Sequence, residues 1–542
     1  MAQRSVESEV KLEAGVGFVL PDLTGEAGIT ASPRAERRLT ASYVDTPDLR
    51  LMRSGVTLRH RHEVESGSPV VSEWTLKLPL APDGAMVVRR EMRWSGSVEE
   101  MPADVDALVI GWRRSVPLEV VARLVTVRQR IMLCDSGGRQ LIELDDDVVS
   151  VMEGPRLAAR FRELELEVAG SAGRRLVEEV VERLERAGAH RGDDRAKVVK
   201  ALGAPASAPP DVVALPLSRQ ATMTEIVRSA LADGYLRIVD HHAGIHLDED
   251  IEDVHQARVA TRRLRSDLRL LRRSMDRDWV RAARRELGWL AGALGAVRDA
   301  DVLTDRLRAS GALLSDDDGP AVEALLATLR AERVVAREAL VASMCSPRYA
   351  ALLDRLAAAV ADPPMAPRRE PAVADATAPP VVEEAEPSPA GAPAPGGCAV
   401  RAPGDLRARK VLPAAVARPM RHLAGAVRAL GEAPSDDALH QVRLFAKRLR
   451  YGCETATPVC GKEAKSMGRA AADLQAVLGN LHDAVVAATW LRRVGSGASA
   501  AVALAAGQLI ALEEAQADLL RSSWRRAWRP VSRKKAVAWL EG

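Results

Sequence analysis

Residues 6–12 have the sequence VESEVKL, in which charged residues alternate with apolar residues or serine. Side chains in a β-strand point alternately to two faces, so Glu7, Glu9 and Lys11 share one face. The same kind of alternation recurs in seven further segments, which are 38–45, 56–63, 72–79, 86–94, 123–133, 140–149 and 161–168. Turn-forming residues separate several of these segments. We therefore predict eight strands in the first 203 residues, with an amphipathic helix at 173–188.

The charged faces of the predicted strands are sorted by sign. The first, seventh and eighth strands carry mostly carboxylates, and the third, fourth and sixth carry mostly cations. For any single strand, a sheet with one solvated face explains the pattern. Eight strands, however, are about the number that closes a barrel around side chains or one small ligand. Carboxylates are hard oxygen ligands for Mg²⁺ or Mn²⁺, and guanidinium groups bind phosphate oxygens. We predict an eight-stranded antiparallel β-barrel or tunnel with flanking helices, whose interior suits a metal–polyphosphate complex.

The rest of the chain contains an internal repeat. HQAR at 255–258 recurs as HQVR at 440–443, and LGAVRDA at 294–300 recurs as LGNLHDA at 478–484. The two matches keep the same order and nearly the same offset. Both halves are rich in Ala, Leu, Arg and Glu with helical periodicity. This pattern predicts an all-α domain of two repeated helical bundles, each of about four helices, so the chain is α+β and multidomain.

Composition divides the chain into unlike segments. We expect a tunnel domain at 1–203, a linker at 204–216, helical repeats at 217–361 and 406–540, and a disordered Pro/Ala-rich linker at 362–405 between the repeats. The formal net charge of +3 comes from 77 Lys and Arg and 74 Asp and Glu. It combines a tunnel domain of −3, a Pro/Ala-rich linker of −4 and a remainder of +10, which is residues 204–361 and 406–542. The helical region is therefore basic enough for a polyanion partner.

The composition also excludes several classes of protein. With 47% hydrophobic and 28% charged residues, the chain is globular. No run approaches the ~18 apolar residues that a membrane span needs, and the N-terminal residues lack the apolar stretch of a signal peptide. The cysteines are odd in number and have no CxxC spacing; they are Cys134, Cys345, Cys398, Cys453 and Cys460. We expect a cytoplasmic protein with no membrane partner. No GxxxxGK[ST] loop occurs, which excludes a P-loop mechanism.

The first 200 residues resemble the CYTH family, the triphosphate tunnel metalloenzymes. The resemblance begins with the ExExK pattern of Glu7, Glu9 and Lys11. It continues through YVDTP at 43–47, LRHR at 58–61, Thr75-Leu76-Lys77, Arg89-x-Glu91, Arg128-x-Arg130, Glu143-x-x-x-Asp147, Glu163-x-Glu165-x-Glu167 and Lys197. Asp145 is an additional acid in this pattern, and Arg195-Ala196 stands where a serine often precedes the late lysine.

The resemblance implies a metal-dependent triphosphatase or cyclase with a defined set of site residues. The implied Mg²⁺ or Mn²⁺ ligands are Glu7, Glu9, Glu163 and Glu165, with Glu143. The implied phosphate-binding residues are Lys11, Arg59, Arg61, Lys77, Arg89, Arg128, Arg130 and Lys197. In such a site the metal polarises the terminal phosphoryl group, and the cations stabilise the charge of the transition state.

The helical repeats carry two matching basic stripes. The first stripe is His255, Arg258, Arg262, Arg265 and Arg269, and the second is His440, Arg443, Lys447 and Arg450. This spacing places each set on one helix face. A solvated face would have the same spacing, but the recurrence with histidine first, and without interleaved acids, favours a binding surface. We expect each histidine to donate a hydrogen bond to an anion or to pack against its stripe, and Asp299 and Asp483 to orient the arginines.

The patterns HxxRVxxRRLR and LGxxRDxDVL resemble the CHAD domain, over roughly 215–360 and 405–538. In the second repeat Val485 replaces the acid found at Asp301, and His482 replaces Arg298. The resemblance implies that the stripes bind inorganic polyphosphate across a basic groove, and that the protein associates with polyphosphate granules. Nucleic acid is not the expected partner, because only 3% of residues are aromatic and none lies in the stripes.

Three functions are compatible with these patterns. The leading one is hydrolysis of inorganic triphosphate in the tunnel, with polyphosphate bound by the helical module. The alternatives are a non-catalytic polyphosphate-binding protein and a class IV-type adenylate cyclase, for which the sequence offers no adenine pocket. The sequence does not distinguish inorganic from nucleoside or thiamine triphosphate, and it does not indicate the preferred metal or the oligomeric state.

Overall fold

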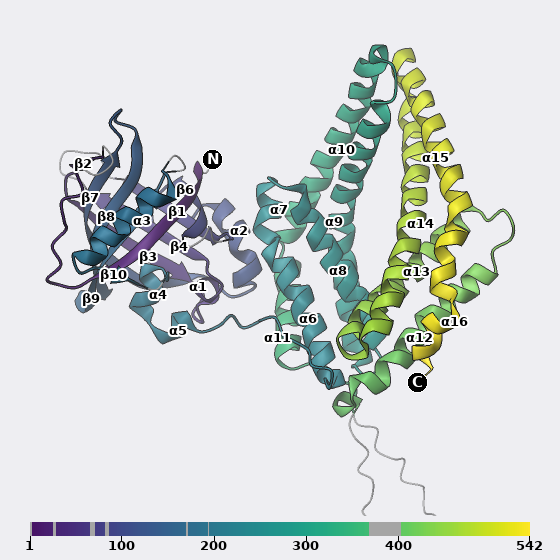
Figure 1. Cartoon of the computed structure of the whole chain (residues 1–542), viewed down its shortest axis with the longest axis horizontal. Coiled ribbons are helices and arrows are strands. Elements are labelled where there is room, and N and C mark those ends of the chain that lie inside the picture. The colour runs from purple at the N-terminus through teal and green to yellow at the C-terminus, as the bar shows by residue number, and fades with distance from the viewer. Residues whose placement is uncertain are drawn as a thin grey trace, which may run out of the picture. The chain divides into compact units, whose positions relative to one another are not determined.

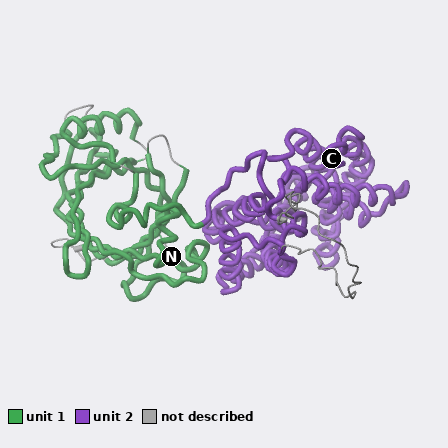
Figure 2. The backbone as a smooth tube through the Cα atoms, turned by 90° about the horizontal axis from the view of Figure 1, so that it is seen from below, with its two compact units in different colours: residues 1–211 green, residues 212–542 purple. Residues whose placement is uncertain are grey.

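The chain forms two compact units, residues 1–211 and 212–542 (Figure 2). The computed structural model describes residues 3–24, 29–64, 71–81, 86–169, 172–192, 194–367 and 403–541. The boundary between the units falls inside the expected linker 204–216, and α5 (Ala204–Ser207) occupies the start of that segment. Residues 368–402, which make up most of the predicted disordered linker, lie outside the described residues. None of the described helices is both long enough and apolar enough to cross a membrane.

Unit 1 is a closed antiparallel β-barrel. Its strands are β1 (Gln3–Ala14), β2 (Thr30–Pro33), β3 (Arg37–Asp45), β4 (Thr57–Val64), β5 (Val71–Pro79), β6 (Val87–Ser95), β7 (Glu119–Cys134), β8 (Gln140–Glu153), β9 (Arg156–Val168) and β10 (His190–Arg191). Eight of them pair in the order β1-β6-β5-β4-β3-β7-β8-β9, and β9 pairs back with β1, which closes the ring (Figures 1 and 2). The predicted eight-stranded barrel is confirmed. The short strands β2 and β10, which extend the sheet beside β7 and β1, were not predicted.

The outer face of the barrel has an apolar patch on β1, β8 and β9 that α3 (Arg174–Arg186) covers. This helix is the predicted amphipathic segment at 173–188. Its buried side chains pack against leucines of β1, β8 and β9, in a cluster that includes Val177, Val180, Val181, Leu184, Leu12, Leu144, Leu164 and Leu166. Full burial of one such side chain contributes about 1.5–3 kcal/mol. Because the outward residues supply this apolar packing, the alternate residues of the same strands are left to line a polar interior.

A buried aspartate fixes the connection between β3 and β4. Asp45 is fully buried, and its carboxylate accepts backbone N–H groups of Leu51 at 3.0 Å and Met52 at 2.9 Å. These bonds hold the short helix α1 (Arg50–Arg53) against the end of β3. The YVDTP motif therefore sets the position of the two neighbouring strands that carry Tyr43 and Arg59. The remaining helices of unit 1 are α2 (Ala103–Arg113) and α4 (Lys197–Leu202).

Unit 2 is all-helical and contains both repeats. The first repeat comprises α6 (Met223–Asp240), α7 (His242–Leu247), α8 (Ile251–Leu271), α9 (Arg277–Gly311), α10 (Gly319–Met344) and α11 (Pro347–Ala361), with the 3₁₀ turn η1 (Asp316–Asp318). The second comprises α12 (Ala408–Arg428), α13 (Asp436–Cys460), α14 (Lys462–Gly495), α15 (Ala500–Ser532) and α16 (Lys534–Val537), with η2 (Pro403–Asp405) before it and η3 (Ala538–Leu540) after it. The predicted all-helical repeats are confirmed, with α8 equivalent to α13 and α9 to α14.

The two repeats form one unit because they share core side chains. Leu307 of α9 and Leu329 of α10 pack in the same buried cluster as Leu491 of α14 and Leu509 of α15. A buried carboxylate, Glu513 of α15, also accepts bonds from Arg306 and Ser310 of α9, at 2.6 and 2.8 Å. The long hairpins α9–α10 and α14–α15 are visible in Figure 1. Shared packing therefore fixes the two predicted bundles against each other.

Candidate functional site

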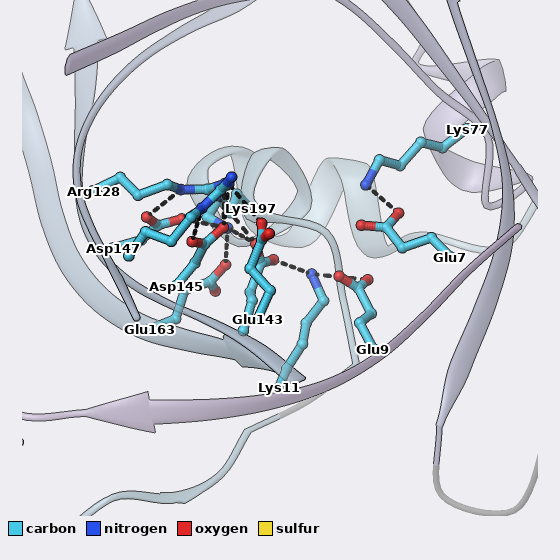
Figure 3. Close-up of polar contacts among 12 residues, drawn as sticks. Glu7, Glu9, Lys11, Lys77, Arg128, Glu143, Asp145, Asp147, Glu163 and Lys197 are labelled. Carbon is cyan, nitrogen blue, oxygen red and sulfur yellow. Dashed lines mark hydrogen bonds and ion pairs between the residues drawn. The ribbon is translucent and has the colours of Figure 1, made fainter. Parts of the chain in front are cut away.

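Strand register brings the charged side chains of the barrel into cross-strand rows. Around β9, Glu167 pairs with Glu9 of β1 on one side and with Glu143 of β8 on the other. One step along, Glu165 pairs with Lys11 and with Asp145. Directly paired side chains lie about 4.5–5.5 Å apart at Cβ. The register therefore gathers carboxylates from three strands inside the barrel, as Figure 3 shows.

These rows line a cavity of about 370 Å³. Ten of its lining residues are cationic: Lys11, Arg37, Arg59, Arg61, Lys77, Arg89, Arg93, Arg128, Arg130 and Lys197. Six are acidic: Glu63, Glu73, Glu91, Glu143, Glu165 and Glu167. The other three are Tyr43, Thr57 and Ala196. All eight cations that the sequence assigned to phosphate binding line this one cavity, which offers almost no apolar surface.

Lys197, the first residue of α4, is held among three buried carboxylates. Its Nζ lies 2.9 Å from Asp147, 2.9 Å from Glu163 and 2.5 Å from Glu165. Burial opposes the charged form of Lys197, but these carboxylates outweigh it and raise the pKa of the amino group well above its usual value. Lys197 thus neutralises the wall formed by β8 and β9, and its predicted contact with phosphate stays a prediction.

The predicted phosphate-binding cations differ in how strongly the protein already pairs them. Arg128 is bidentate with Asp147, at 2.8 and 2.6 Å, because the two residues are cross-strand partners. Arg130 lies 2.8 Å from both Asp145 and Glu143. By contrast, Arg59 donates to the Tyr43 hydroxyl at 3.4 Å and has no ion pair among the described residues. Arg59 is therefore the cation most available to an incoming anion.

The acid-rich end of the tunnel contains a group of potential metal ligands. Glu143, Asp145 and Glu167 each offer a carboxylate oxygen, and these oxygens lie within 4.8 Å of one another. Burial and the nearby charge of Glu7 raise the pKa of Glu167 to about 8, and burial also raises the pKa of Glu143. Arg130 already pairs with Glu143 and Asp145, whereas Glu167 has no ion pair among the described residues. A hard divalent cation would compensate the remaining negative charge and would find carboxylate oxygens, the ligand type it prefers. The donor set therefore fits Mg²⁺ or Mn²⁺.

The residues assigned as metal ligands from sequence do not all lie in this group. Glu143 belongs to it, and Glu9 is the cross-strand partner of Glu167. Glu7 pairs with Lys77, while Glu163 is fully buried and bonds to Lys197 and Lys200. Glu165 bonds to Lys11 at 2.8 Å. The structure thus adds Asp145 and Glu167 as candidate metal ligands. Only the register of β8 and β9 could have distinguished these two residues from Glu163.

Several tunnel residues had no role in the sequence interpretation. Arg37 pairs with Glu63 at 2.7 Å, and Arg61 pairs with Glu73 at 2.5 Å. Glu91 bonds to Lys77 at 2.9 Å. Burial alone would raise the pKa of Glu91, but Lys77 and the other nearby cations outweigh burial and lower this pKa to about 2. Extending the alternation from Tyr43 would have found Arg37, and extending it from Arg59 would have found Glu63. Each pair is separated by an even number of residues, so its two side chains point to the same face of a strand.

In unit 2 the two basic stripes face each other. Lys447 of α13 is close enough to Arg258 and Arg262 of α8 for repulsion. Burial and this repulsion, together with Arg443, lower the pKa of Lys447 to about 6. No carboxylate pairs with Lys447, Arg262 or Arg443 among the described residues. The stripes thus combine into one cluster with excess positive charge.

Equivalent glycines of α9 and α14 lie beside arginines of the two stripes. A Cβ added to Gly295 would lie 3.9 Å from the Arg258 guanidinium, and one added to Gly479 would lie 3.7 Å from the Arg443 guanidinium, which are ordinary van der Waals contacts. The repeated LG motif therefore marks the place where equivalent arginines lie against the next helix. Asp299 accepts from Arg258 at 2.8 Å, as predicted.

The second stripe departs from the sequence interpretation in three ways. Arg450 bonds to Glu454 at 2.8 Å, so this stripe is not free of acids four residues away. Asp483 forms no ion pair with it in the part of the chain that the structure describes. His440 contacts His482, with 3.1 Å between their Nδ1 atoms, whereas the first repeat has an arginine at the position of His482. The two repeats therefore contribute unequally to the cluster.

Comparison with known proteins agrees with this two-part organisation. Residues 6–199 match the CYTH domain and residues 229–492 match the CHAD domain. Two uncharacterized proteins of Mycobacterium tuberculosis, from strains CDC 1551 / Oshkosh and ATCC 25618 / H37Rv, are each 30% identical over 512 aligned positions, which cover 89% of this chain and 87% of the relative. The chain is a CYTH–CHAD protein.

Solved structures are similar to each domain separately. The CHAD half is similar to PptA from Streptomyces chartreusis, with 22% identity, a TM-score of 0.41, and coverage of 57% of this chain and 98% of that one. It is also similar to the CHAD domain of the plant Ricinus communis, with 23% identity, a TM-score of 0.43, and coverage of 59% and 96%. The CYTH half is similar to a Hippeastrum protein described as a putative adenylyl cyclase with a dominant triphosphatase activity, with 14% identity, a TM-score of 0.25, and coverage of 36% and 94%.

Proposed function

We propose that the CYTH domain hydrolyses inorganic triphosphate with Mg²⁺ or Mn²⁺, and that the CHAD domain binds inorganic polyphosphate. The observation that carries the first part is the cavity lining, in which only Tyr43, Thr57 and Ala196 are uncharged. A nucleoside would bury its base against charged groups that need hydration or ion pairs. An inorganic phosphate chain would instead satisfy the cations along its whole length.

The tunnel residues divide into two groups in this proposal. Glu143, Asp145 and Glu167 would hold the divalent cation, with Glu9 beside them. When bound, the metal would polarise the terminal phosphoryl group and promote ionisation of water. The cations on the opposite strands hold the phosphate chain in place.

Arg59 and Lys77 are the main phosphate-binding groups on those strands. Arg59 forms no direct ion pair among the described residues, although Glu91 attracts it electrostatically, so its guanidinium can turn toward phosphate oxygens. Lys77 shares Glu7 and Glu91, and burial opposes its charge, but these carboxylates raise its pKa and keep the amino group protonated. These fixed cations would stabilise the negative charge that develops on the phosphoryl oxygens.

Phosphate release from inorganic triphosphate, ATP and long-chain polyphosphate, with Mg²⁺ or Mn²⁺, tests the enzymatic part. We expect inorganic triphosphate to be the preferred substrate, because Tyr43 is the single aromatic residue among the described lining residues and most of the others are charged. The Glu7→Gln/Glu9→Gln double variant should lose turnover while the full chain still retains polyphosphate. A well-folded protein that releases phosphate from none of these substrates would instead be a non-catalytic polyphosphate-binding protein. Cyclic AMP as the main product from ATP would indicate a cyclase.

The facing basic stripes support polyphosphate binding by the CHAD domain. A linear polyanion would relieve the mutual repulsion of Arg258, Arg262, Arg443 and Lys447, which the protein leaves largely uncompensated. Changing these four residues to Glu should abolish polyphosphate retention and leave turnover of triphosphate intact. Binding to the unchanged protein should weaken steeply with salt, because cations are released from the polyanion. If retention depended on Glu7 and Glu9 instead, the proposed division between the domains would be wrong.

A further inference from the structure

A second cavity in unit 2, separate from the centre of the stripes, has a different chemical character. It has a volume of about 300 Å³ and lies between the repeats, where the end of α8 meets the middle of α12. Ligand-binding pockets commonly begin at about this size. Its lining combines aliphatic side chains, including Leu270, Leu271 and Val411, with the small residue Ala415.

The polar lining of this cavity is almost entirely cationic. Six arginines contribute, namely Arg269, Arg272, Arg273, Arg418, Arg421 and Arg448. His422 lies beside them, and no Asp or Glu of the described part of the chain lines the cavity. These six arginines make no ion pair among the described residues. Burial and the neighbouring Arg418 and Arg273 lower the pKa of Arg272, as expected for guanidinium groups without a counter-charge. The cavity therefore has a net positive charge that favours an anion, although Arg273, Arg418 and Arg421 are exposed to solvent.

One aromatic ring contacts two of the polar lining residues. The Phe445 ring of α13 lies 5.8 Å from the His422 ring in an edge-to-face arrangement. The Arg448 guanidinium carbon lies 5.0 Å from the centre of the same Phe445 ring. Contacts of this type hold a cation in place without neutralising it. His422 and Arg448 are thus oriented before any ligand binds.

The aliphatic surface distinguishes this cavity from the groove of the first stripe. That groove is lined by Arg258, Arg262 and Arg265 with small residues of α9 and Asp299. An inorganic phosphate chain gains nothing from aliphatic side chains, whereas an apolar or aromatic group does. We propose that the cavity between α8 and α12 binds a small organic phosphate, in which a phosphate or pyrophosphate group is attached to an apolar or aromatic body. A nucleoside diphosphate has this chemistry.

Binding of ADP to the full chain, measured by calorimetry in the presence of a metal chelator, tests the proposal. The chelator suppresses metal-dependent binding in the tunnel. We expect saturable binding of one ADP, at least tenfold tighter than binding of pyrophosphate or of adenosine, because only ADP uses both halves of the cavity. Photolabelling with 8-azido-ADP, followed by mass spectrometry, should mark peptides of α8 and α12.

Two variants separate the charged half from the apolar half. Arg272→Glu/Arg418→Glu should weaken ADP and pyrophosphate binding at least tenfold. Ala415→Trp fills the apolar half and should weaken ADP binding while leaving pyrophosphate binding unchanged. Arg526→Glu/Arg529→Glu, at exposed positions of α15, changes the charge equally and should leave ADP binding unchanged. Circular dichroism confirms that each variant is folded.

Three results would overturn the proposal. The first is no saturable ADP binding to the metal-free chain. The second is pyrophosphate binding as tight as ADP binding and insensitive to Ala415→Trp, which would make the cavity an extension of the polyphosphate surface. The third is photolabel confined to the tunnel. Polyphosphate retention by the stripe variants is measured separately, so failure here is distinguishable from failure of the proposed CHAD function.

Discussion

Replacement of Lys197 by methionine probes the electrostatic structure of the tunnel wall. The lysine Nζ contacts Asp147, Glu163 and Glu165, whose side chains are 0%, 0% and 9% exposed. Methionine has a similar volume and no charge, so Lys197→Met leaves these carboxylates with one cation fewer. Each keeps another partner, namely Arg128, Lys200 and Lys11 respectively.

The expected loss of stability follows from this partial compensation. Breaking a buried ion pair by removing one partner costs about 3–5 kcal/mol. Because every carboxylate retains a second cation, we expect a value near the lower end, about 3 kcal/mol. For a domain of this size, this corresponds to a decrease in Tm of about 6–12 °C.

Thermal denaturation gives the change in Tm, and hydrogen exchange of peptides from β8 and β9 assigns the change to the tunnel. Lys200→Met is the matched control, because Lys200 lies one turn further along α4 and pairs with the fully buried Glu163 and the part-exposed Glu13. It should be clearly less destabilising. A Lys197→Met protein as stable as the unchanged chain, or less affected than Lys200→Met, would refute the assignment of Lys197 as the central cation of this wall.

Three further predictions concern the helical unit. Burial raises the pKa of Asp267, which accepts a hydrogen bond from Thr455, from 3.8 to about 7, so the folded state loses stability as pH rises from about 4 to 7. Relative to the unchanged chain, Asp267→Asn should gain stability over that range by at most about 4 kcal/mol, measured by urea unfolding. A difference in stability that does not depend on pH would contradict this. Bound polyphosphate should raise the pKa of Lys447 from about 6, so that Lys447 takes up a proton on binding at pH 7.5. Calorimetry in buffers of different ionisation enthalpy should detect this proton uptake, and Lys447→Met should abolish it. Glu513→Ala should destabilise the unit by about 2–3 kcal/mol in urea unfolding, because Arg306 loses its buried acceptor. A change in unfolding free energy below about 0.5 kcal/mol would argue against a link between the repeats through Glu513.

The strands and the polar interior were predictable because alternation is a local property. Leu164 and Leu166 alternate with Glu163, Glu165 and Glu167, so the two faces of β9 are evident from eight residues. Eight such segments were enough to predict the closed barrel. The short strands β2 and β10 carry too few residues for a pattern, and they depend on pairing with longer neighbours.

The grouping of the carboxylates was not predictable, because register depends on how distant strands pair. Glu163 and Glu167 are equivalent in the alternation of β9. Pairing places Glu167 between Glu9 and Glu143, and it places Glu163 beside Asp147, where Lys197 neutralises it. The same limit applies to Lys447, whose proximity to the first stripe comes from packing between repeats that are about 185 residues apart.

The most direct test of the central claim is metal-dependent phosphate release from inorganic triphosphate by the full chain and by Arg59→Met. Arg59 forms no direct ion pair among the described residues, and Glu91, which it attracts electrostatically, keeps Lys77 as a direct partner, so the loss of Arg59 removes a phosphate contact without breaking an ion pair. We predict rapid release with Mg²⁺ or Mn²⁺ and none with chelator. We also predict a decrease of at least tenfold in kcat/KM for Arg59→Met, with unchanged Tm. Turnover that needs no divalent metal, or that is unaffected by Arg59→Met, would contradict it.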